Sequence, residues 1–269
     1  MTSVLNQIQL HYQSLSRLEK KVADYVLTNY PKIANMHIKD LANASGVSVA
    51  TITRFSHKVG ATNFVELKIS LRDAIEEEVT KDDVMATVNQ MYRSVVEASE
   101  TLSTLETYNE AVRLLKKAKR IHIFGLGSSG LSGEEFKLRL QRMGYKVDTY
   151  HDSHSMILSA AIMTEEDCVL AISSSGETSE IIDSFELAKK NKASILVMTN
   201  YVDTKLTSFS DVTLFTYSMR AFKTKGLLNS QLSILYVIDL LTLLLMQDET
   251  NQHNYDKTLT ALKAYKTTK

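Results

Sequence analysis

Glycine and proline are so scarce in this chain that few residues are available to break regular structure. The 269 residues contain nine glycines and one proline, and four of the glycines lie within residues 125–133. A sequence this poor in chain breakers favours long regular elements joined by short turns. We therefore expect the glycine cluster at 125–133 to adopt a local conformation that other residues cannot.

The chain has two parts that differ in their secondary-structure pattern. Residues 1–110 show helical periodicity, whereas from residue 120 short β-branched runs alternate with helix-length segments. This alternation is typical of βαβ units and a parallel sheet. We expect an all-α head, then an α/β domain with a doubly wound, parallel, five-stranded sheet of the flavodoxin-like kind. The expected strands are RIHIF, YKVDTY, DCVLAIS, ASILVMTN and DVTLFT.

Composition excludes several classes of protein. Apolar residues make up 44% of the chain, too many for a disordered one. The single cysteine excludes an intramolecular disulfide framework and favours a reducing compartment. The N-terminus lacks the pattern of a signal peptide, and the apolar stretch 232–246 is too short to span a bilayer. The expected protein is cytoplasmic, has no membrane part, and uses 232–246 as a buried helix.

In residues 1–72, the helix-capping residues, the few glycines and the single proline predict a helix-turn-helix. Ser16 and Glu19 form a capping-box pattern, and Pro31 is expected to close the helix that follows. A second helix fits 38–45 and ends at Gly46. Ser48 can cap a third helix that stops at Gly60, and a single long helix is expected over 84–118.

The third helix has the pattern of a DNA-recognition helix. Its inner face is apolar, and its outer face is polar and cationic, so Arg54 suits a guanine edge and Lys58 suits a phosphate. Residues 1–72 hold nine basic and four acidic residues, so a basic head of net charge +5 is hidden in a chain that is neutral overall. A plain helical bundle with a solvated face remains the alternative. The expected DNA-binding residues are Ser48, Ala50, Thr51, Thr53, Arg54, His57 and Lys58.

The glycine cluster joins an expected strand, 120–124, to an expected helix that begins near Leu131. A glycine-rich turn at a helix N-terminus lets backbone amides approach an anion. The segment also matches G-x-G-x-x-G, and Asp148 or Asp152 could serve a ribose, so a dinucleotide site is a rival. A turn that only packs a helix on a strand is a second alternative.

A second polar loop favours a phosphosugar over a dinucleotide. The strand at 167–172 runs into Ser-Ser-Ser-Gly-Glu-Thr, which supplies four hydroxyls where helix capping would need one. In a doubly wound sheet both loops lie at the carboxyl edge, where ligands bind. The expected ligand-binding residues are Gly127, Ser128, Ser129, Ser173, Ser174, Ser175 and Thr178.

These motifs carry a resemblance to known families. The serine-threonine loop, preceded by the Gly125–Gly130 loop, resembles the sugar isomerase (SIS) phosphosugar-binding domain. Residues 38–71 resemble the helix-turn-helix of RpiR-type transcriptional regulators. The resemblance implies a DNA-binding transcriptional regulator of sugar metabolism whose SIS domain binds a phosphosugar effector that modulates DNA binding.

Because SIS domains also occur in isomerases, a phosphosugar isomerase with an accessory helical domain is the alternative function. Such an enzyme needs a base, and the candidates are Glu134, Glu135, His151, His154 and Glu177. We read the two histidines as solvated loop residues and Cys168 as a small buried residue. We expect no catalytic residue, no metal site and no cofactor.

The expected organisation follows from both motifs. We expect residues 1–78 to form the DNA-binding domain, residues 79–110 a helical linker and residues 111–269 the SIS domain. The charged run near 76–83 lies at the first boundary. The expected partners are double-stranded operator DNA, a small phosphosugar, and further copies of the chain in a homodimer or homotetramer. A dimer would suit a pseudo-palindromic operator with half-sites about 34–36 Å apart, or a multiple of that.

Overall fold

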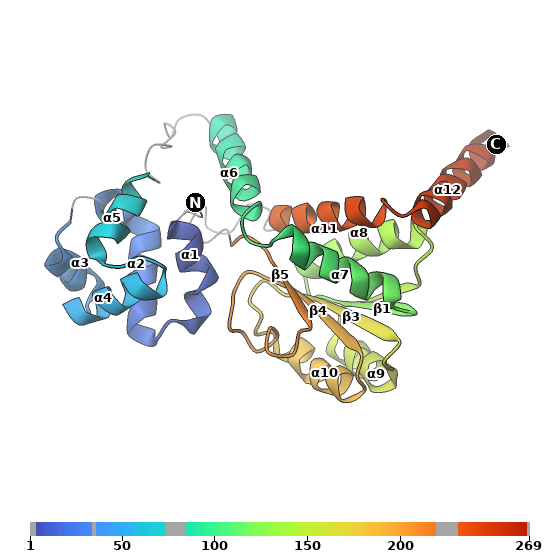
Figure 1. Cartoon of the computed structure of the whole chain (residues 1–269), viewed down its shortest axis with the longest axis horizontal. Helices are drawn as coiled ribbons and strands as arrows, with labels where there is room; N and C mark the ends of the chain where they lie inside the picture. Colours follow the sequence, from blue (N-terminus) through green and yellow to red (C-terminus); the bar gives the residue numbers. More distant parts are fainter. Residues whose placement is uncertain (1–3, 34–35, 74–83, 219–230, 268–269) are drawn as a thin grey trace. The chain divides into compact units, whose positions relative to one another are not determined.

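The protein is described by a computed structural model that covers residues 4–33, 36–73, 84–218 and 231–267 (Figure 1). The chain divides into two compact units. The first, the helical unit, holds the described residues up to Thr101 together with Asn200–Thr204, Tyr217 and Ser218. The second, the sheet unit, holds the remaining described residues.

The helical unit has the expected helices around one apolar core. Phe55 and Ile52 of the third predicted helix are fully buried against Leu41 and Val22. Tyr201, two residues beyond the fourth strand of the sheet, is also buried in this core, where its ring contacts that of Tyr12. The helices are α1 Val4–Leu10, α2 Arg17–Ile33, α3 Ile38–Ser45, α4 Val49–Lys58, α5 Phe64–Asp73 and α6 Val84–Ser99, with a 3-10 turn at Tyr12–Ser14.

The turn between α3 and α4 has the geometry that the sequence predicts. Gly46 adopts a left-handed conformation, with φ of 65°, and Val47 donates its N–H to the carbonyl of Ala42 at 2.9 Å. Ser48 then caps α4 by accepting the N–H of Thr51 at 3.2 Å. The predicted helix-turn-helix is therefore present, with α4 as its second helix.

An ion pair between a buried carboxylate and a partly exposed lysine joins the start of α2 to the end of α4. Glu19 closes the capping box by accepting the N–H of Ser16 at 2.8 Å, and its carboxylate also receives Lys58 Nζ at 2.8 Å. The Glu19 side chain is only 3% exposed. Burial raises the pKa of this carboxyl, but the hydrogen bonds from Lys58 and Ser16 outweigh burial, and the pKa of Glu19 is lowered.

Two expectations for the first part of the chain are wrong. Pro31 does not close α2, because the helix departs from helical geometry at Asn29 and continues to Ile33. The single helix expected over 84–118 is two helices, since α6 ends at Ser99 and Thr104 caps α7 (Leu105–Lys117) by accepting the N–H of Thr107. The charged run expected as a boundary at 76–83 lies wholly outside the described residues.

The sheet unit contains the five expected strands, all parallel, in the order β2-β1-β3-β4-β5. The strands are β1 Arg120–Phe124, β2 Val147–Tyr150, β3 Asp167–Ile172, β4 Ser194–Thr199 and β5 Val212–Phe215. The helices are α7 Leu105–Lys117, α8 Ser128–Arg142, α9 Ser153–Ile162, α10 Ser179–Lys190, α11 Leu232–Leu245 and α12 Glu249–Thr267.

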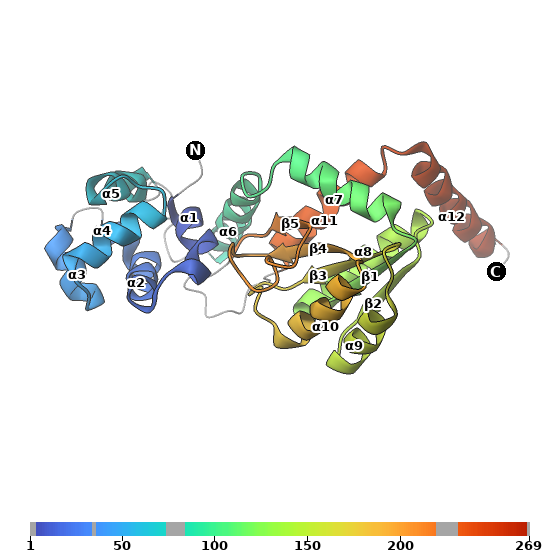
Figure 2. The same ribbon diagram turned by 60° about the horizontal axis from the view of Figure 1, so that its bottom comes forward.

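Helices cover both faces of the sheet, as the doubly wound prediction requires (Figures 1 and 2). Alternate strand residues point to opposite faces: Ile121 and Ile123 pack with α7, α8 and α11, whereas Val169 and Ala171 pack with α9 and α10. The buried apolar helix expected at 232–246 is α11. It buries six of its residues and packs on the face of the sheet that carries Ile121 and Ile123. None of the described helices is long and apolar enough to cross a membrane.

We predict that Glu19→Gln destabilises the helical unit, because it leaves Lys58 without its anion. The loss in free energy of unfolding should be about 1–3 kcal/mol near neutral pH, measured by urea unfolding. Since the pKa of Glu19 is lowered in the folded state, this stabilisation is present above the unfolded pKa and is lost as pH falls through the folded one. The difference between wild type and variant should therefore vanish in acid.

Glu97→Gln is the matched control, since Glu97 is an exposed carboxylate of α6 in the same unit. A Glu19→Gln protein as stable as wild type near neutral pH would show that the ion pair contributes nothing.

Candidate functional site

The pairing of β1 with β3 brings the two polar loops together. Phe124 at the end of β1 lies opposite Ala171 of β3 in the parallel register. The strand order also reverses direction between these two strands, since β2 lies beyond β1 and β4 lies beyond β3. Open α/β sheets bind ligands at such a switch point, outside the carboxyl ends of the strands.

The first loop, residues 125–130, leads from β1 directly into α8. Gly127 precedes the helix with φ of 55° and ψ of −129°, a conformation that residues other than glycine rarely adopt. Ser128 is exposed and Ser129 half-buried, and within the described part of the chain no group hydrogen-bonds to either hydroxyl. Both hydroxyls and the first amides of α8 are therefore available to an anion.

The second loop, residues 173–178, leads from β3 into α10 and is stabilised by hydrogen bonds between its own residues. Ser173 is 4% exposed, and its Oγ lies 2.8 Å from Oγ1 of Thr178 and accepts the N–H of Gly176 at 3.2 Å. Ser175 accepts the N–H of Glu177 at 3.2 Å, which leaves its own hydroxyl proton free to donate. Ser174 is half-buried, and no described residue hydrogen-bonds to its hydroxyl.

The seven predicted ligand residues thus divide into three roles. Ser173 and Thr178 hold the second loop in shape, whereas Ser128, Ser129, Ser174 and Ser175 keep donors available, and Gly127 supplies the backbone conformation. The structure brings all seven to the same edge of the sheet.

Two contacts at this edge were missed by the sequence analysis. Gln231, just before α11, donates from Nε2 to the carbonyl of Ser128 at 2.7 Å, across 103 positions of sequence. The Glu177 carboxylate accepts the N–H of Lys205 at 2.8 Å. No local sequence signal distinguishes residues whose partners are so distant in the chain.

Two of the candidate bases, Glu134 and Glu135, are poorly suited to proton abstraction. Hydrogen bonds from Thr149 and His151 lower the pKa of Glu134 to about 2, which makes it a weak base. Glu135 is paired with Arg139 at 2.9 Å. His154 was expected in a loop but lies in the first turn of α9.

The described residues offer neither a reactive thiol nor a cluster of metal ligands. As expected, Cys168 is fully buried, and burial raises the pKa of its thiol to about 12, so it is not a thiolate near neutral pH. In the ranges that the structure covers, no three His, Cys, Asp or Glu side chains are placed to hold a metal ion.

The outer face of α4 is solvent-exposed in the helical unit. Ala50, Arg54 and His57 are exposed and share one face at spacings of four and three residues. Thr53 beside them is half-buried, and its hydroxyl bonds to the carbonyl of Val49. In a helix-turn-helix it is the outer face of the second helix that turns toward the major groove.

Most of the predicted DNA-binding residues also have partners within the fold, and Arg54 itself donates from Nη2 to the Thr51 hydroxyl at 3.3 Å. Thr51 is 2% exposed, and its hydroxyl lies 3.0 Å from that of Ser48, the residue that caps α4. Lys58 is held by Glu19. The geometry therefore leaves Ala50, Arg54 and His57 as the most accessible of the predicted set.

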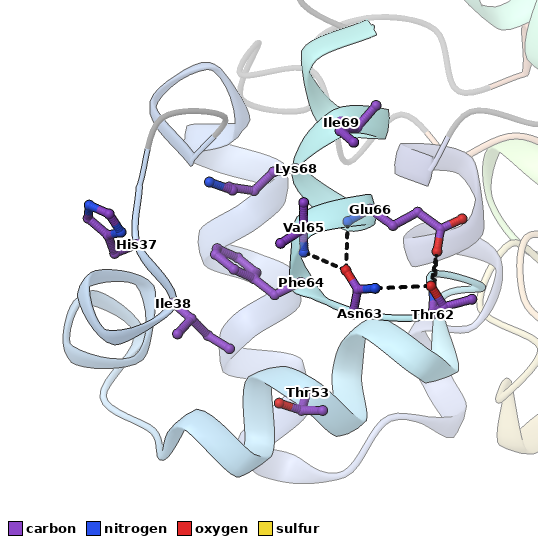
Figure 3. A pocket seen from close by; sticks show the side chains of 10 residues that line it. All are labelled: His37, Ile38, Thr53, Thr62, Asn63, Phe64, Val65, Glu66, Lys68 and Ile69. Carbon is purple, nitrogen blue, oxygen red and sulfur yellow. Dashed lines mark hydrogen bonds between the residues drawn. The ribbon is translucent and has the colours of Figure 1, made fainter.

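A groove of about 770 Å³ lies beside α4, at the start of α5 (Figure 3). Phe64, Val65 and Ile69 form its apolar part. Asn63 caps α5 by accepting the N–H groups of Val65 and Glu66 at 2.9 and 3.0 Å, as the dashed lines in Figure 3 show. The groove belongs to the helical unit and is separate from the two sheet loops.

Two family models match the chain, and together they cover most of it. Residues 2–78 match the helix-turn-helix domain of the rpiR family, and residues 114–244 match the SIS domain. An HTH-type transcriptional regulator of Haemophilus influenzae is 31% identical over 262 residues, which covers 92% of this chain and 91% of that protein.

Solved structures share the fold. The Vibrio vulnificus NanR protein complexed with ManNAc-6P superposes with a TM-score of 0.62 at 23% identity, covering 97% of this chain and 98% of that one. The sugar isomerase domain of an RpiR transcription factor from Sphaerobacter thermophilus superposes with a TM-score of 0.60 at 13% identity, covering 67% of this chain and 98% of that one.

We predict that Gly130→Ala destabilises the sheet unit, although alanine is the better helix former. A Cβ at position 130 would lie 2.6 Å from Nδ1 of His151 and 2.7 Å from the carbonyl oxygen of Gly125, so the first loop would have to shift. The expected loss in free energy of unfolding is about 1–3 kcal/mol. Ser129→Ala, which removes only a free hydroxyl from the same turn, is the control. A Gly130→Ala protein at least as stable as wild type would contradict this close packing.

Proposed function

Since the chain belongs to the rpiR family of helix-turn-helix transcriptional regulators, we propose that it binds operator DNA through α4 and that a phosphosugar held by its SIS domain modulates that binding. The observation that carries the effector part is the pair of hydroxyl-rich loops at the β1–β3 switch point. The observation that carries the DNA part is the exposed face of α4.

DNA recognition is supported by both geometry and charge. Residues 1–72 carry a net charge of +5, which provides the electrostatic part of DNA affinity. Arg54 is exposed near the middle of α4, where a bidentate contact to guanine O6 and N7 would read sequence. A protein that binds genomic DNA in this way would work in the cytoplasm of a bacterium.

A phosphate monoester fits the two loops better than a dinucleotide. Both α8 and α10 begin at these loops and direct their N-terminal amides to the same edge. The free hydroxyls of Ser128, Ser129, Ser174 and Ser175 come from both loops, whereas a dinucleotide site would need only the first. The NanR structure, solved with ManNAc-6P, makes that sugar phosphate a sensible first ligand to test.

We infer that the protein is a sensor and not an isomerase. Glu134, a candidate base in α8, has a pKa of about 2 and takes part in several hydrogen bonds. Incubation of the pure protein with fructose 6-phosphate or ribulose 5-phosphate should give no ketose-to-aldose conversion; turnover would establish the enzyme alternative.

Coupling between effector and DNA is supported by the path of the chain after β4. Tyr201 follows β4, whose carboxyl end is at the ligand edge, and its side chain is buried in the core of the helical unit. Val202 donates its N–H to the carbonyl of Leu10 at 3.0 Å. A short connection of this kind gives the two units a covalent link beside the ligand loops. A homodimer or homotetramer would let two heads bind a pseudo-palindromic operator.

We predict that Arg54→Ala weakens specific operator binding by about 1–3 kcal/mol and relaxes the preference for the operator over unrelated DNA. Fluorescence anisotropy with DNA from upstream of the gene measures both affinities. Lys21→Ala, which removes an exposed positive charge from α2, is the matched control and should weaken all DNA binding slightly and uniformly. Equal effects of the two variants on specificity would exclude base reading by Arg54.

We predict that Ser175→Ala weakens phosphosugar binding about fivefold, the worth of one hydrogen bond. A thermal-shift panel of sugar phosphates, with ManNAc-6P included, identifies the ligand, since a ligand at 100 times its Kd stabilises a protein by about 2.7 kcal/mol. Calorimetry then compares the variant with wild type.

The same variant tests the coupling. Without ligand, Ser175→Ala should bind operator as wild type does, because the helical unit is unchanged. At ligand concentrations that just saturate wild type, its DNA affinity should respond less. Wild-type ligand affinity in the variant would show that the second loop is not the binding site.

A further inference from the structure

A cluster of polar side chains lies directly behind the first loop, around the carboxylate of Glu134 in α8. One carboxylate oxygen accepts from the Thr149 hydroxyl and lies 2.9 Å from Nε2 of His151. The other lies 3.2 Å from Lys137 Nζ. Residues from α8, from β2 and from the segment after β2 thus converge on a single anion.

His151 connects this anion to the loop itself. Its Nδ1 lies 3.2 Å from the carbonyl oxygen of Gly125, the first residue of the loop. The ring also packs on Gly130, the last residue of the loop, so closely that a Cβ there would meet Nδ1 at 2.6 Å. His151 therefore contacts both ends of the segment that carries Ser128 and Ser129.

Both ring nitrogens of His151 face acceptors, one carbonyl oxygen and one carboxylate oxygen. A neutral imidazole carries one N–H, so it can donate to only one of them, whereas the imidazolium donates to both. The charged groups around the ring are Glu134 and Lys137 from α8 and Asp152 on its own segment, and Gly125 presents only backbone. Glu134 stays ionised through the physiological range because Thr149 and His151 hydrogen-bond to it.

We propose that His151, held by Glu134, is a positioning residue that fixes the first loop in its ligand-binding shape. The two hydrogen bonds of its ring, to Gly125 and to Glu134, form what we call the clasp, and the clasp is complete only when His151 is protonated. The part that concerns ligand affinity rests on the proposed phosphosugar function, whereas the part that concerns loop order does not. When His151 loses its proton, one of the two hydrogen bonds is lost and the loop opens more readily.

Hydrogen exchange of the ligand-free protein tests the clasp. In wild type, protection of the amides at 125–130, corrected for intrinsic exchange, should fall about fivefold as pH is raised and His151 loses its proton. The fall should follow the titration of His151 observed by NMR. In His151→Gln the protection should be low throughout the same pH interval, and the loop at 173–178 should be unaffected.

Two further variants keep the test decisive. Glu134→Gln retains a hydrogen-bonding side chain without the charge, so it should lower protection of 125–130 even if His151→Gln folds poorly. His253→Gln changes an exposed histidine of α12 and should behave as wild type. Equal and pH-independent protection in wild type, His151→Gln and Glu134→Gln would overturn the proposal.

Ligand affinity gives the second readout, with ManNAc-6P as the probe. A phosphate monoester itself gains charge near pH 6, so the useful quantity is the ratio of wild-type to His151→Gln affinity at each pH, in which ligand ionisation cancels. This ratio should fall toward one as pH rises. A clasp confirmed by exchange, in a protein that binds no sugar phosphate, would refute the proposed function and leave the loop-positioning role supported.

Discussion

The parallel pairing of β1 with β3 is the contact on which the ligand edge depends. It places Phe124 opposite Ala171, so that two loops separated by more than 40 positions of sequence begin side by side. Neither loop alone offers more than a helix N-terminus and a few hydroxyls. Together they bring serine hydroxyls and the N-termini of α8 and α10 to one edge of the sheet, and under the proposed function these groups bind a phosphate without a metal ion.

The helical unit uses its charges in a way that a count cannot reveal. The net charge of +5 includes Lys58, yet this cation serves the fold by neutralising Glu19. A buried carboxylate without a partner would be costly, so the pair ties the end of α4 to the start of α2. α4 is thereby held in place by a residue of its own, and under the proposed function base reading falls to its exposed residues Ala50, Arg54 and His57.

Features encoded by neighbouring residues could be predicted from the sequence, and features that depend on distant partners could not. The five strands, the Gly46 turn and the Ser48 cap are local patterns, and all are present. The break between α6 and α7 was missed because the apolar spacing continues through a segment where Thr104 starts a new helix. The burial of Thr51 and the contacts of His151 with Gly125 and Glu134 arise only from packing.

The construction of the two loops also limits what they can recognise. Gly127 and Gly176 have positive φ, and around them the groups on offer are backbone amides and serine hydroxyls. Under the proposed function such groups bind the phosphate that every sugar phosphate shares, so they define the class of effector and leave its sugar unspecified. Discrimination among sugars must then come from side chains that approach the loops from other elements. Gln231, which is bonded to the carbonyl of Ser128, is one side chain in that position.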